Sequence, residues 1–167
     1  MIWSLSNRAD PAAVVIADRH YNRQKPGTPQ FVPPGRCLVL RTDSAVWVTS
    51  WPFAEYVKHA WAGAWVNSLF RKEGEGIASE MIRAAVAATC WYYGDPPKLG
   101  MVTFIDSRKV KPIKRRGRNV WGYSYMRAGF IPVGETAGGL LAFQLLSEDM
   151  PVPAPPINAQ IRMFGIG

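Results

Sequence analysis

Two glycines stand between a β-rich run and a long helical pattern. The run covers residues 64–70, and the chain then passes through Gly74 and Gly76 into an apolar periodicity that starts at Ile77. Glycines leave main-chain N–H groups accessible, and a helix N-terminus attracts anions. The loop therefore suits a phosphate or pyrophosphate, and it equally suits a tight turn without a ligand. Its spacing matches neither a P-loop nor the GxGxxG of dinucleotide-binding folds.

Positive charge is concentrated between residues 108 and 118. This segment has no acidic residue and contains seven basic ones, which are Arg108, Lys109, Lys111, Lys114, Arg115, Arg116 and Arg118. The whole chain has 20 Lys and Arg against 12 Asp and Glu, a formal net charge of +8, so most of the excess is local. Such a segment can grip nucleic-acid phosphates, or it can form a solvated basic loop without a specific partner.

Side chains able to move a proton lie at two further places. His20 and Tyr21 end the pattern of the first helix, and Asp106 follows a buried strand pattern at 101–105. Ligands of open sheets lie beyond the carboxyl ends of strands, and histidine exchanges protons near neutral pH. His20 or Asp106 could relieve an attacking amine of its proton. Each also has an ordinary use, His20 in packing and Asp106 in capping the following turn.

Four tryptophans offer rings for stacking on a nucleobase. They lie in or beside strand patterns and are Trp47, Trp51, Trp61 and Trp65. An enzyme that acts on a base of a duplex must extrude the base and hold it against apolar or aromatic side chains. Most tryptophans at strand positions belong to a core, so we expect no more than one or two of these four to be exposed.

The elements that position these residues follow from periodicity and capping. Asp10 and Pro11 begin a short helix that ends near Tyr21. A second helix runs from residue 77 to 93 and ends before two prolines, and a third runs from 121 to 128 and ends at Gly129. A hairpin joins strands at 37–42 and 45–51, and the further strands are expected at 64–70, 101–105, 130–133 and 140–146.

Length and composition favour one soluble domain. A chain of 167 residues with 48% hydrophobic content can bury a single core. We expect this domain over residues 1–149 and an extended or loosely packed, proline-rich tail over 150–167. Cys37 and Cys90 are too few for a disulfide framework and form no CxxC pair, so we expect a cytoplasmic protein without a zinc site. No apolar run is long enough for a membrane span.

These features resemble the GNAT superfamily of N-acetyltransferases. Its coenzyme A signature, [RQ]xxGx[GA] between a strand and a helix, is matched by residues 71–76. Its aromatic-rich helix ending in Gly-Phe is matched by residues 123–130, and the element order agrees over about 11–146. The resemblance implies an α/β (α+β) fold with a mixed β-sheet splayed at the centre, between the strands at 64–70 and 101–105, and flanked by helices.

The same resemblance implies a donor and an acid. Acetyl-CoA or a related acyl-CoA would lie in the gap, Tyr125 would protonate the departing thiolate, and the cofactor-binding residues would be Arg71, Lys72, Gly74, Glu75, Gly76 and Ile77. Members of the superfamily commonly have a glutamate base on the strand before the glycine loop. This chain has Asn67 and Ser68 there, so it departs from the standard amine mechanism.

One divergent branch shares a further set of residues. His20 and Tyr21, the glycine loop, Asp106 and Tyr125 resemble the Mom-like DNA-modification proteins of bacteriophages, which alter adenine and so hide restriction sites. This resemblance implies that these four residues are catalytic, that Arg71 lies near the cofactor loop and that DNA is the substrate. The basic segment at 108–118 would then grip phosphates that flank the target base.

The sequence thus predicts a GNAT-fold transferase that modifies a nucleobase amine in DNA. Two alternatives remain open: a conventional acetyl-CoA-dependent N-acetyltransferase acting on a small-molecule or protein amine, and an inert nucleic-acid-binding module of the same fold. The high positive charge argues against cationic substrates such as polyamines. Because many GNAT proteins dimerise, the resemblance also admits a homodimer.

Overall fold

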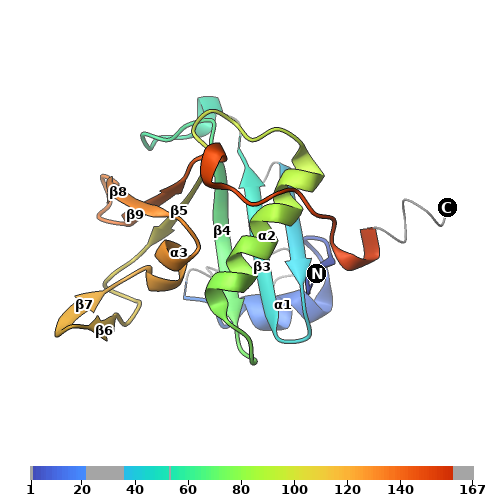
Figure 1. The fold of residues 1–167 in the computed structure, drawn as a ribbon, viewed down its shortest axis with the longest axis horizontal. Helices are drawn as coiled ribbons and strands as arrows, with labels where there is room; N and C mark the ends of the chain where they lie inside the picture. The colour runs from blue at the N-terminus through green and yellow to red at the C-terminus, as the bar shows by residue number, and fades with distance from the viewer. Residues whose placement is uncertain (1, 22–35, 53, 160–167) are drawn as a thin grey trace.

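A seven-stranded mixed sheet forms the centre of the molecule (Figure 1). The computed structural model describes residues 2–21, 36–52 and 54–159. The strand order is β1-β2-β3-β4-β5-β9-β8, in which β4 and β5 are parallel and every other neighbouring pair is antiparallel. Within those three ranges, none of the helices has the length and apolar character needed to span a membrane. The expected class, a mixed sheet with flanking helices, is confirmed.

The elements have the following bounds. The sheet consists of β1 (Ser4–Leu5), β2 (Arg36–Arg41), β3 (Ala45–Trp51), β4 (Trp65–Lys72), β5 (Met101–Ile105), β8 (Ile131–Glu135) and β9 (Leu141–Leu145). A separate two-stranded ribbon contains β6 (Ile113–Arg115) and β7 (Arg118–Val120). The helices are α1 (Pro11–Ala17), α2 (Ala78–Tyr93) and α3 (Tyr123–Arg127), with short 3-10 turns at Ala54–Tyr56 and Ser147–Asp149.

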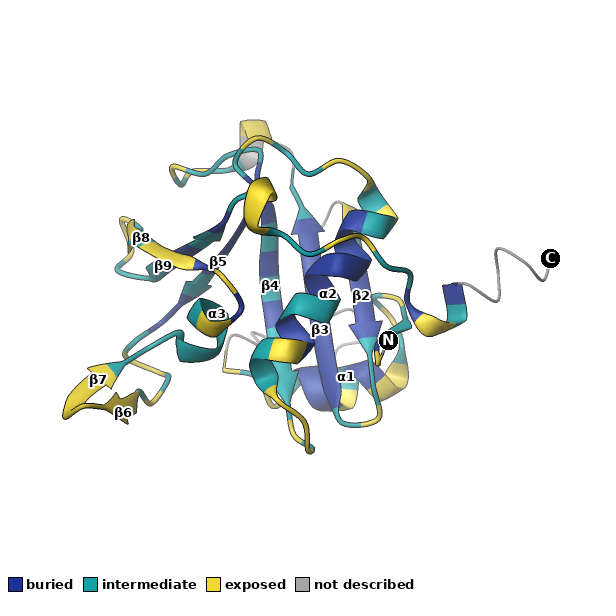
Figure 2. Cartoon of the chain, viewed as in Figure 1, coloured by how far each residue is buried: buried dark blue, intermediate teal, exposed yellow. Residues whose placement is uncertain are grey.

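Helices cover both faces of the sheet, and β3 shows how. Val46 and Val48 pack in one apolar cluster with Ile16 of α1, whereas Trp47 packs in another with Ile82 of α2. Successive strand residues point to opposite faces, so a strand covered on both sides needs apolar residues at both parities. β3 is accordingly buried along nearly its whole length (Figure 2).

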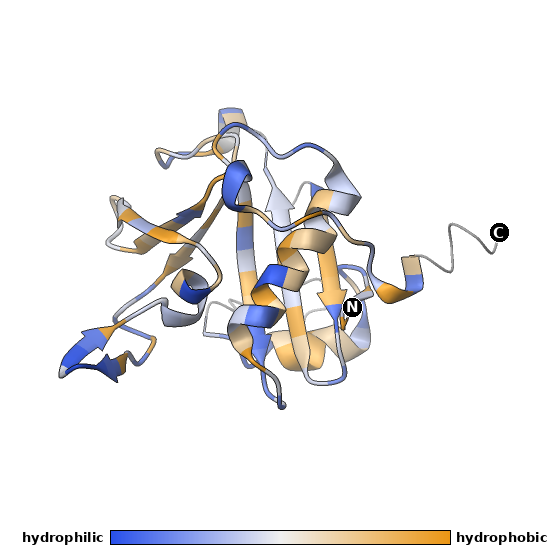
Figure 3. Cartoon of the chain, viewed as in Figure 1, coloured by the Kyte–Doolittle hydropathy of each residue, from blue (hydrophilic) through white to orange (hydrophobic). Residues whose placement is uncertain are grey.

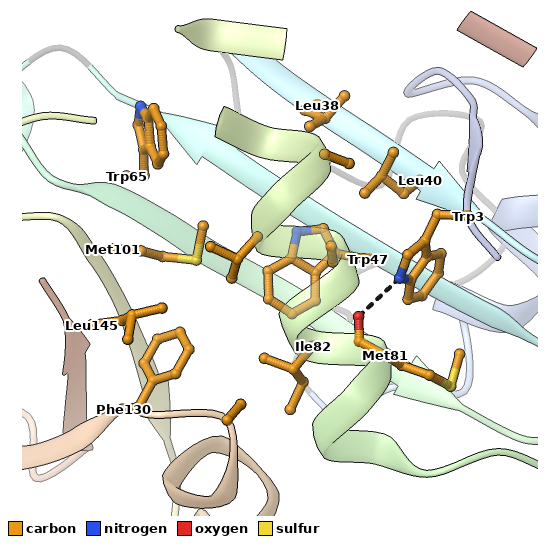
Figure 4. Packing of buried hydrophobic residues seen from close by; sticks show 14 of the residues in the cluster. Trp3, Leu38, Leu40, Trp47, Trp65, Met81, Ile82, Met101, Phe130 and Leu145 are labelled. Carbon is orange, nitrogen blue, oxygen red and sulfur yellow. Dashed lines mark hydrogen bonds between the residues drawn. The ribbon is translucent and has the colours of Figure 1, made fainter. Parts of the chain in front are cut away.

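The α2 side of the core is built on tryptophans (Figure 4). Trp3, Trp47 and Trp65 are all completely buried. The indole N–H of Trp3 donates to the carbonyl of Met81 at 2.9 Å, and that of Trp47 donates to Thr49 at 2.7 Å. Trp47 and Trp65 therefore cannot stack on a ligand, which corrects their inclusion among the stacking candidates. The other two, Trp51 and Trp61, are half-buried, in line with the expected limit of one or two.

Several expected elements are shorter or longer than their patterns indicate. α1 ends at Ala17 rather than near Tyr21, because the next residues close tighter turns in which Arg19 and His20 donate to the carbonyls three residues earlier. α3 starts at Tyr123, and β4 extends beyond the expected end to Lys72. β1 was not predicted, because two residues carry no periodicity.

The C-terminal segment was expected to be extended or loosely packed. Residues 151–156 have no regular secondary structure, but 157–159 form a helical turn, and the segment packs against the domain. The N–H of Ala154 donates to the carbonyl of Ala87 on α2 at 3.1 Å. The Asn158 side chain accepts from the N–H of Leu5 and donates to its carbonyl, at 2.6 and 2.8 Å. This amide thus supplies the edge strand β1 with hydrogen bonds that another strand would otherwise make. The rest of the expected tail, 160–167, lies outside the described residues.

Candidate active site

The two parallel strands of the sheet separate, and a cavity lies between them. β4 pairs with β5 only where residues 65–67 lie beside 101–103. Past this point β4 continues to Lys72 and β5 to Ile105, and a cavity of about 320 Å³ forms between their diverging ends. Its wall contains the predicted residues His20, Tyr21, Arg71, Lys72 and Tyr125. No Asp or Glu is among the described residues of this wall.

A β-bulge on β4 marks the place where the strands part. Val48 lies opposite Leu69, but the next residue of β3, Thr49, lies opposite Asn67, so Ser68 is an extra residue on β4. The Asn67 side-chain N–H₂ fills the irregularity by donating to the carbonyls of Val48 and Leu69, both at 3.0 Å. Bulges bend a strand and increase its twist. The bulge, which the Asn67 side chain stabilises, therefore helps to open the gap between β4 and β5.

Asn67 also fixes the hydroxyl of Tyr125. Because its amide nitrogen faces two carbonyl oxygens, the opposite orientation would place Oδ1 against them, so Oδ1 must face the cavity side. There Oδ1 accepts from Tyr125 Oη at 2.5 Å and from Thr103 Oγ1 at 3.3 Å. Burial raises the pKa of Tyr125. Tyr125 is thus a neutral phenol whose proton points at Asn67 and whose lone pairs remain for another donor.

His20 and Tyr21 line the same cavity. Their rings stack with centroids 4.5 Å apart and planes inclined by 30°. The Tyr21 hydroxyl donates to the carbonyl of Phe104 at 3.4 Å and accepts from the N–H of Asp106 at 3.5 Å, both long contacts. Burial, with a smaller effect of the Asp106 charge, raises the pKa of Tyr21. The predicted His20 and Tyr21 therefore come together with Tyr125 around one cavity.

Asp106 is close to this group but its carboxylate is engaged elsewhere. Oδ1 accepts from the backbone N–H and from Nε of Arg108, at 3.0 and 2.9 Å, and the side chain is nearly buried. The Arg108 guanidinium holds the pKa of Asp106 below its usual range. Asp106 therefore stays ionised, paired and off the cavity wall, and of its two expected uses the structure displays the capping of the turn.

The glycine loop is tied internally through Glu73. Arg19 donates to both Glu73 oxygens at 2.5 Å, and Arg71 donates to one of them at 2.8 Å. Hydrogen bonds from Arg19 and then Arg71 lower the pKa of Glu73 to about 2. Lys72 Nζ donates to the carbonyl of Gly74 at 2.7 Å. The charged groups of the loop therefore largely satisfy one another, and sequence reasoning missed Arg19 because it lies 54 residues from its partner.

The two glycines have different uses. A Cβ on Gly74 would lie 2.2 Å from Ser44 Oγ and 2.8 Å from Ser44 Cβ, so Gly74 lets the loop approach the β2–β3 turn. Gly76 has a φ of +117°, and a Cβ there would meet ordinary contacts only. Ile77, the N-cap of α2, makes no side-chain capping bond. The start of α2 thus fits an anionic group, whereas Gly74 is required for packing.

The sequence predicted a loop for the basic segment 108–118, but the structure has the two-stranded β6–β7 ribbon there. Arg116 and Gly117 form its turn with φ angles of +53° and +77°. The guanidinium of Arg115 lies 4.3 Å from the ring centroid of Tyr123 on α3. The segment leads directly from Asp106 to the helix that carries Tyr125 (Figure 1), and its Val110 lines the cavity.

An aromatic group continues the wall at Phe104. The Phe104 ring, which lines the cavity, lies 4.9 Å from that of His59 and 5.9 Å from that of Trp61. Burial lowers the pKa of His59, whose Nδ1 accepts from the N–H of Trp61 at 3.1 Å. Of the two candidates that are not completely buried, Trp51 and Trp61, only Trp61 has a described ring contact with a cavity residue. No sequence pattern pointed to Phe104 or His59, because their proximity depends on the fold.

Comparisons with protein-family models, curated proteins and solved structures find no match for this chain. Inference about its function therefore depends on the residues of the cavity and of the ribbon. Across residues 2–21, 36–52 and 54–159, no three His, Cys, Asp or Glu side chains gather in a way that could hold a metal ion.

Proposed function

We propose that this protein is a GNAT-fold transferase that modifies a nucleobase amine in DNA. The observation that carries the proposal is the cavity between the separating ends of β4 and β5, where His20, Tyr21 and Tyr125 meet. The strand order, with one parallel pair that splays at the centre of an otherwise antiparallel sheet, supports the resemblance noted from the sequence. The adjoining cationic ribbon supports an anionic macromolecule as substrate.

The donor would be an acyl-CoA or a chemically related molecule with a diphosphate. Its anionic part would bind the uncapped N–H groups at the start of α2, next to Gly76. Arg71 and Lys72 reach from the loop to the cavity wall and would favour the same charge. The acyl end would lie in the gap between β4 and β5. The role of Gly74 in this scheme is to place the loop, since Ser44 occupies its open side.

The target base would lie between the stacked His20–Tyr21 pair and Tyr125. The amine nitrogen attacks the acyl carbon, the C–S bond of the thioester breaks, and the amine loses a proton. His20 is the better base, because Asp106 is committed to Arg108 and lies off the wall. Tyr125 accepts a hydrogen bond from the amine N–H, since its own proton is directed at Asn67. To protonate the thiolate, Tyr125 would first have to break that bond.

Mass analysis of nucleosides tests this proposal. Digested DNA from cells that express the protein should contain a modified nucleoside that is absent from cells without it. The variant Tyr125→Phe should lower its amount at least tenfold, whereas Tyr92→Phe, a matched change of an exposed tyrosine outside the cavity, should have no effect. Unmodified DNA in all samples would reject the transferase.

The conventional acetyltransferase remains a second candidate, because the start of α2 would bind the same donor whatever the acceptor. Purified protein incubated with labelled acetyl-CoA and either plasmid DNA or a panel of amines separates the two. Label that enters only amines would exclude DNA as the acceptor. If neither acceptor is labelled and nucleosides remain unchanged while DNA is bound, the protein is an inert binding module.

A further inference from the structure

The β6–β7 ribbon projects from the body of the molecule as a small sheet of its own (Figures 1 and 3). Its residues are exposed except for half-buried Val120. We propose that this ribbon enters the major groove of duplex DNA and contacts it through its tip and outer face. The inference rests on the proposed function, because it takes DNA as the partner. It adds that the DNA is double-stranded and that the β6–β7 ribbon is the element that contacts its bases.

The register of the ribbon divides its side chains between two faces. Arg115 lies opposite Arg118 and Ile113 opposite Val120, and these pairs share one face because they are two residues apart. Arg115 stacks on Tyr123 of α3, so this face is turned toward the protein. The pair formed by Lys114 and Asn119 belongs to the other face. The protein thus anchors the inner face and leaves the outer face for a partner.

The tip of the ribbon is strained for an arginine. Both turn residues have positive φ, as in the tightest hairpin turns, and Arg116 is the only non-glycine residue with positive φ in the described part of the chain. Asparagine or glycine adopts this conformation at lower conformational cost. An arginine there indicates that its charge serves a contact outside the turn, because the turn itself gains nothing from it.

The chemistry of the ribbon fits a duplex groove. Residues 107–134 contain no Asp or Glu, so no carboxylate of this stretch neutralises the tip. The major groove of B-DNA is about 12 Å wide and admits a two-stranded β-ribbon. Arginine and asparagine, present here as Arg116 and Asn119, are the side chains that pair with guanine and adenine edges in that groove. A single strand offers charge but no groove, so it should bind less tightly.

The variant Arg116→Asn removes the positive charge at the tip and keeps a residue that suits the conformation of the turn. It creates Asn-Gly, the sequence best suited to this turn, so the thermal unfolding midpoint should not fall. The dissociation constant for a short duplex, measured by fluorescence anisotropy, should rise about tenfold at 0.15 M salt, and the slope of log K against log salt should shrink by about 0.9. Lys98→Asn, an equal loss of charge at an exposed site on another loop, should change neither quantity. Unchanged affinity of the Arg116 variant would overturn the proposal.

The nucleic acid is varied in the second part of the test. The unmodified chain should bind the duplex at least tenfold more tightly than either of its strands. A duplex whose cytosines carry glucosylated hydroxymethyl groups, which fill the major groove, should bind more weakly than the plain duplex. Equal binding to duplex and single strand, or to plain and filled grooves, would reject groove entry. None of these measurements requires catalysis, so nucleoside analysis can fail while the ribbon proposal holds, and the reverse.

Discussion

Two loops follow the separating ends of β4 and β5, and they differ in how far their charged side chains are paired within the protein. Each starts with an arginine and a carboxylate two residues apart, Arg71 with Glu73 in one and Asp106 with Arg108 in the other. In the first loop Glu73 also binds Arg19, and Lys72 bonds a carbonyl of the loop itself. The second loop has a single acid at its start and no other before residue 135.

This difference separates two ways of holding an anion. In the first loop the side-chain charges are largely satisfied within the protein, so a phosphate there would depend on main-chain N–H groups at the start of α2. In the second loop cations project on a ribbon and need counterions from a partner, which makes binding dependent on salt. A small anionic donor suits the first arrangement, and a polyanion suits the second.

Asn67→Asp should have the largest effect, because Asn67 stabilises the bulge at which β4 and β5 separate. The substitution replaces N–H donors with a carboxylate oxygen that faces the carbonyls of Val48 and Leu69. The other carboxylate oxygen keeps the Tyr125 and Thr103 donors, but no cation neutralises the buried charge among the described hydrogen bonds of this residue. A buried charge without a counter-charge destabilises proteins by about 3 to 5 kcal/mol, which should appear in the free energy of unfolding from urea titration. The same change at exposed Asn119 should cost under about 0.5 kcal/mol. A loss below about 1 kcal/mol at Asn67 would show that its amide is oriented the other way.

Neutralising the two loops in turn tests the comparison itself. Replacing Lys109, Lys111, Lys114 and Arg116, which are all exposed, with Gln should weaken binding to duplex DNA by about 100-fold at moderate salt, through lost phosphate contacts. The double variant Arg71→Gln with Lys72→Gln should change the same dissociation constant less than about threefold, because these side chains already bond to Glu73 and Gly74. An equal loss of affinity in both variants would mean that DNA contacts the two loops to the same extent.

Most of the fold could be predicted from local patterns, because the strands alternate or are uniformly apolar, α1 has a clear N-cap at Asp10, and α2 has a long apolar period that ends before two prolines. The parallel pair, the hairpin and α2 were expected within about two residues of their observed bounds. β6 and β7 were missed because each has three residues and their basic composition hides any alternation. β1 depends on Asn158, which is more than 150 residues away in sequence.

The candidate site was predictable only in part. His20, Tyr21 and Tyr125 were expected together, and they line one cavity. The pairing of Asp106 with Arg108 is local, and the capping of this turn was one of the two uses expected for Asp106. Two other features depend on tertiary contacts that no local pattern carries: the hydrogen bond of Asn67 to Val48 across the bulge, and the close approach of Gly74 to Ser44. Residue type thus located the polar groups, and only the fold showed which of them are already engaged.

Gly74→Ala should have an intermediate effect, confined to the first loop and the β2–β3 turn that it contacts. The new Cβ would meet Ser44 at 2.2 Å from Oγ and 2.8 Å from Cβ, so the β2–β3 turn would have to shift. Overpacking of this kind costs about 1 to 3 kcal/mol of unfolding free energy. Adding Ser44→Gly removes both contacts and should restore most of the loss, while DNA binding by the ribbon stays unchanged throughout. If the double variant is no more stable than Gly74→Ala alone, the glycine serves backbone conformation or a ligand rather than this contact.

The smallest effect concerns the pH dependence of the first loop. Because Arg19 and Arg71 lower the pKa of Glu73 from 4.5 to about 2, the carboxylate stabilises the fold fully above pH 4.5. That contribution should fall as pH decreases from 4.5 toward 2, where Glu73 becomes protonated in the folded state as well. The unfolding midpoint of Glu73→Gln should therefore lie slightly below that of the unmodified chain at neutral pH and approach it in acid. Glu148→Gln serves as a control, since Glu148 forms no ion pair among the described residues. If the difference in unfolding midpoint persists unchanged at pH 2, Glu73 stabilises the fold by packing and not by its charge. The contrast between the first loop, whose charges are paired within the protein, and the second, whose cations are not, would then lose its electrostatic basis.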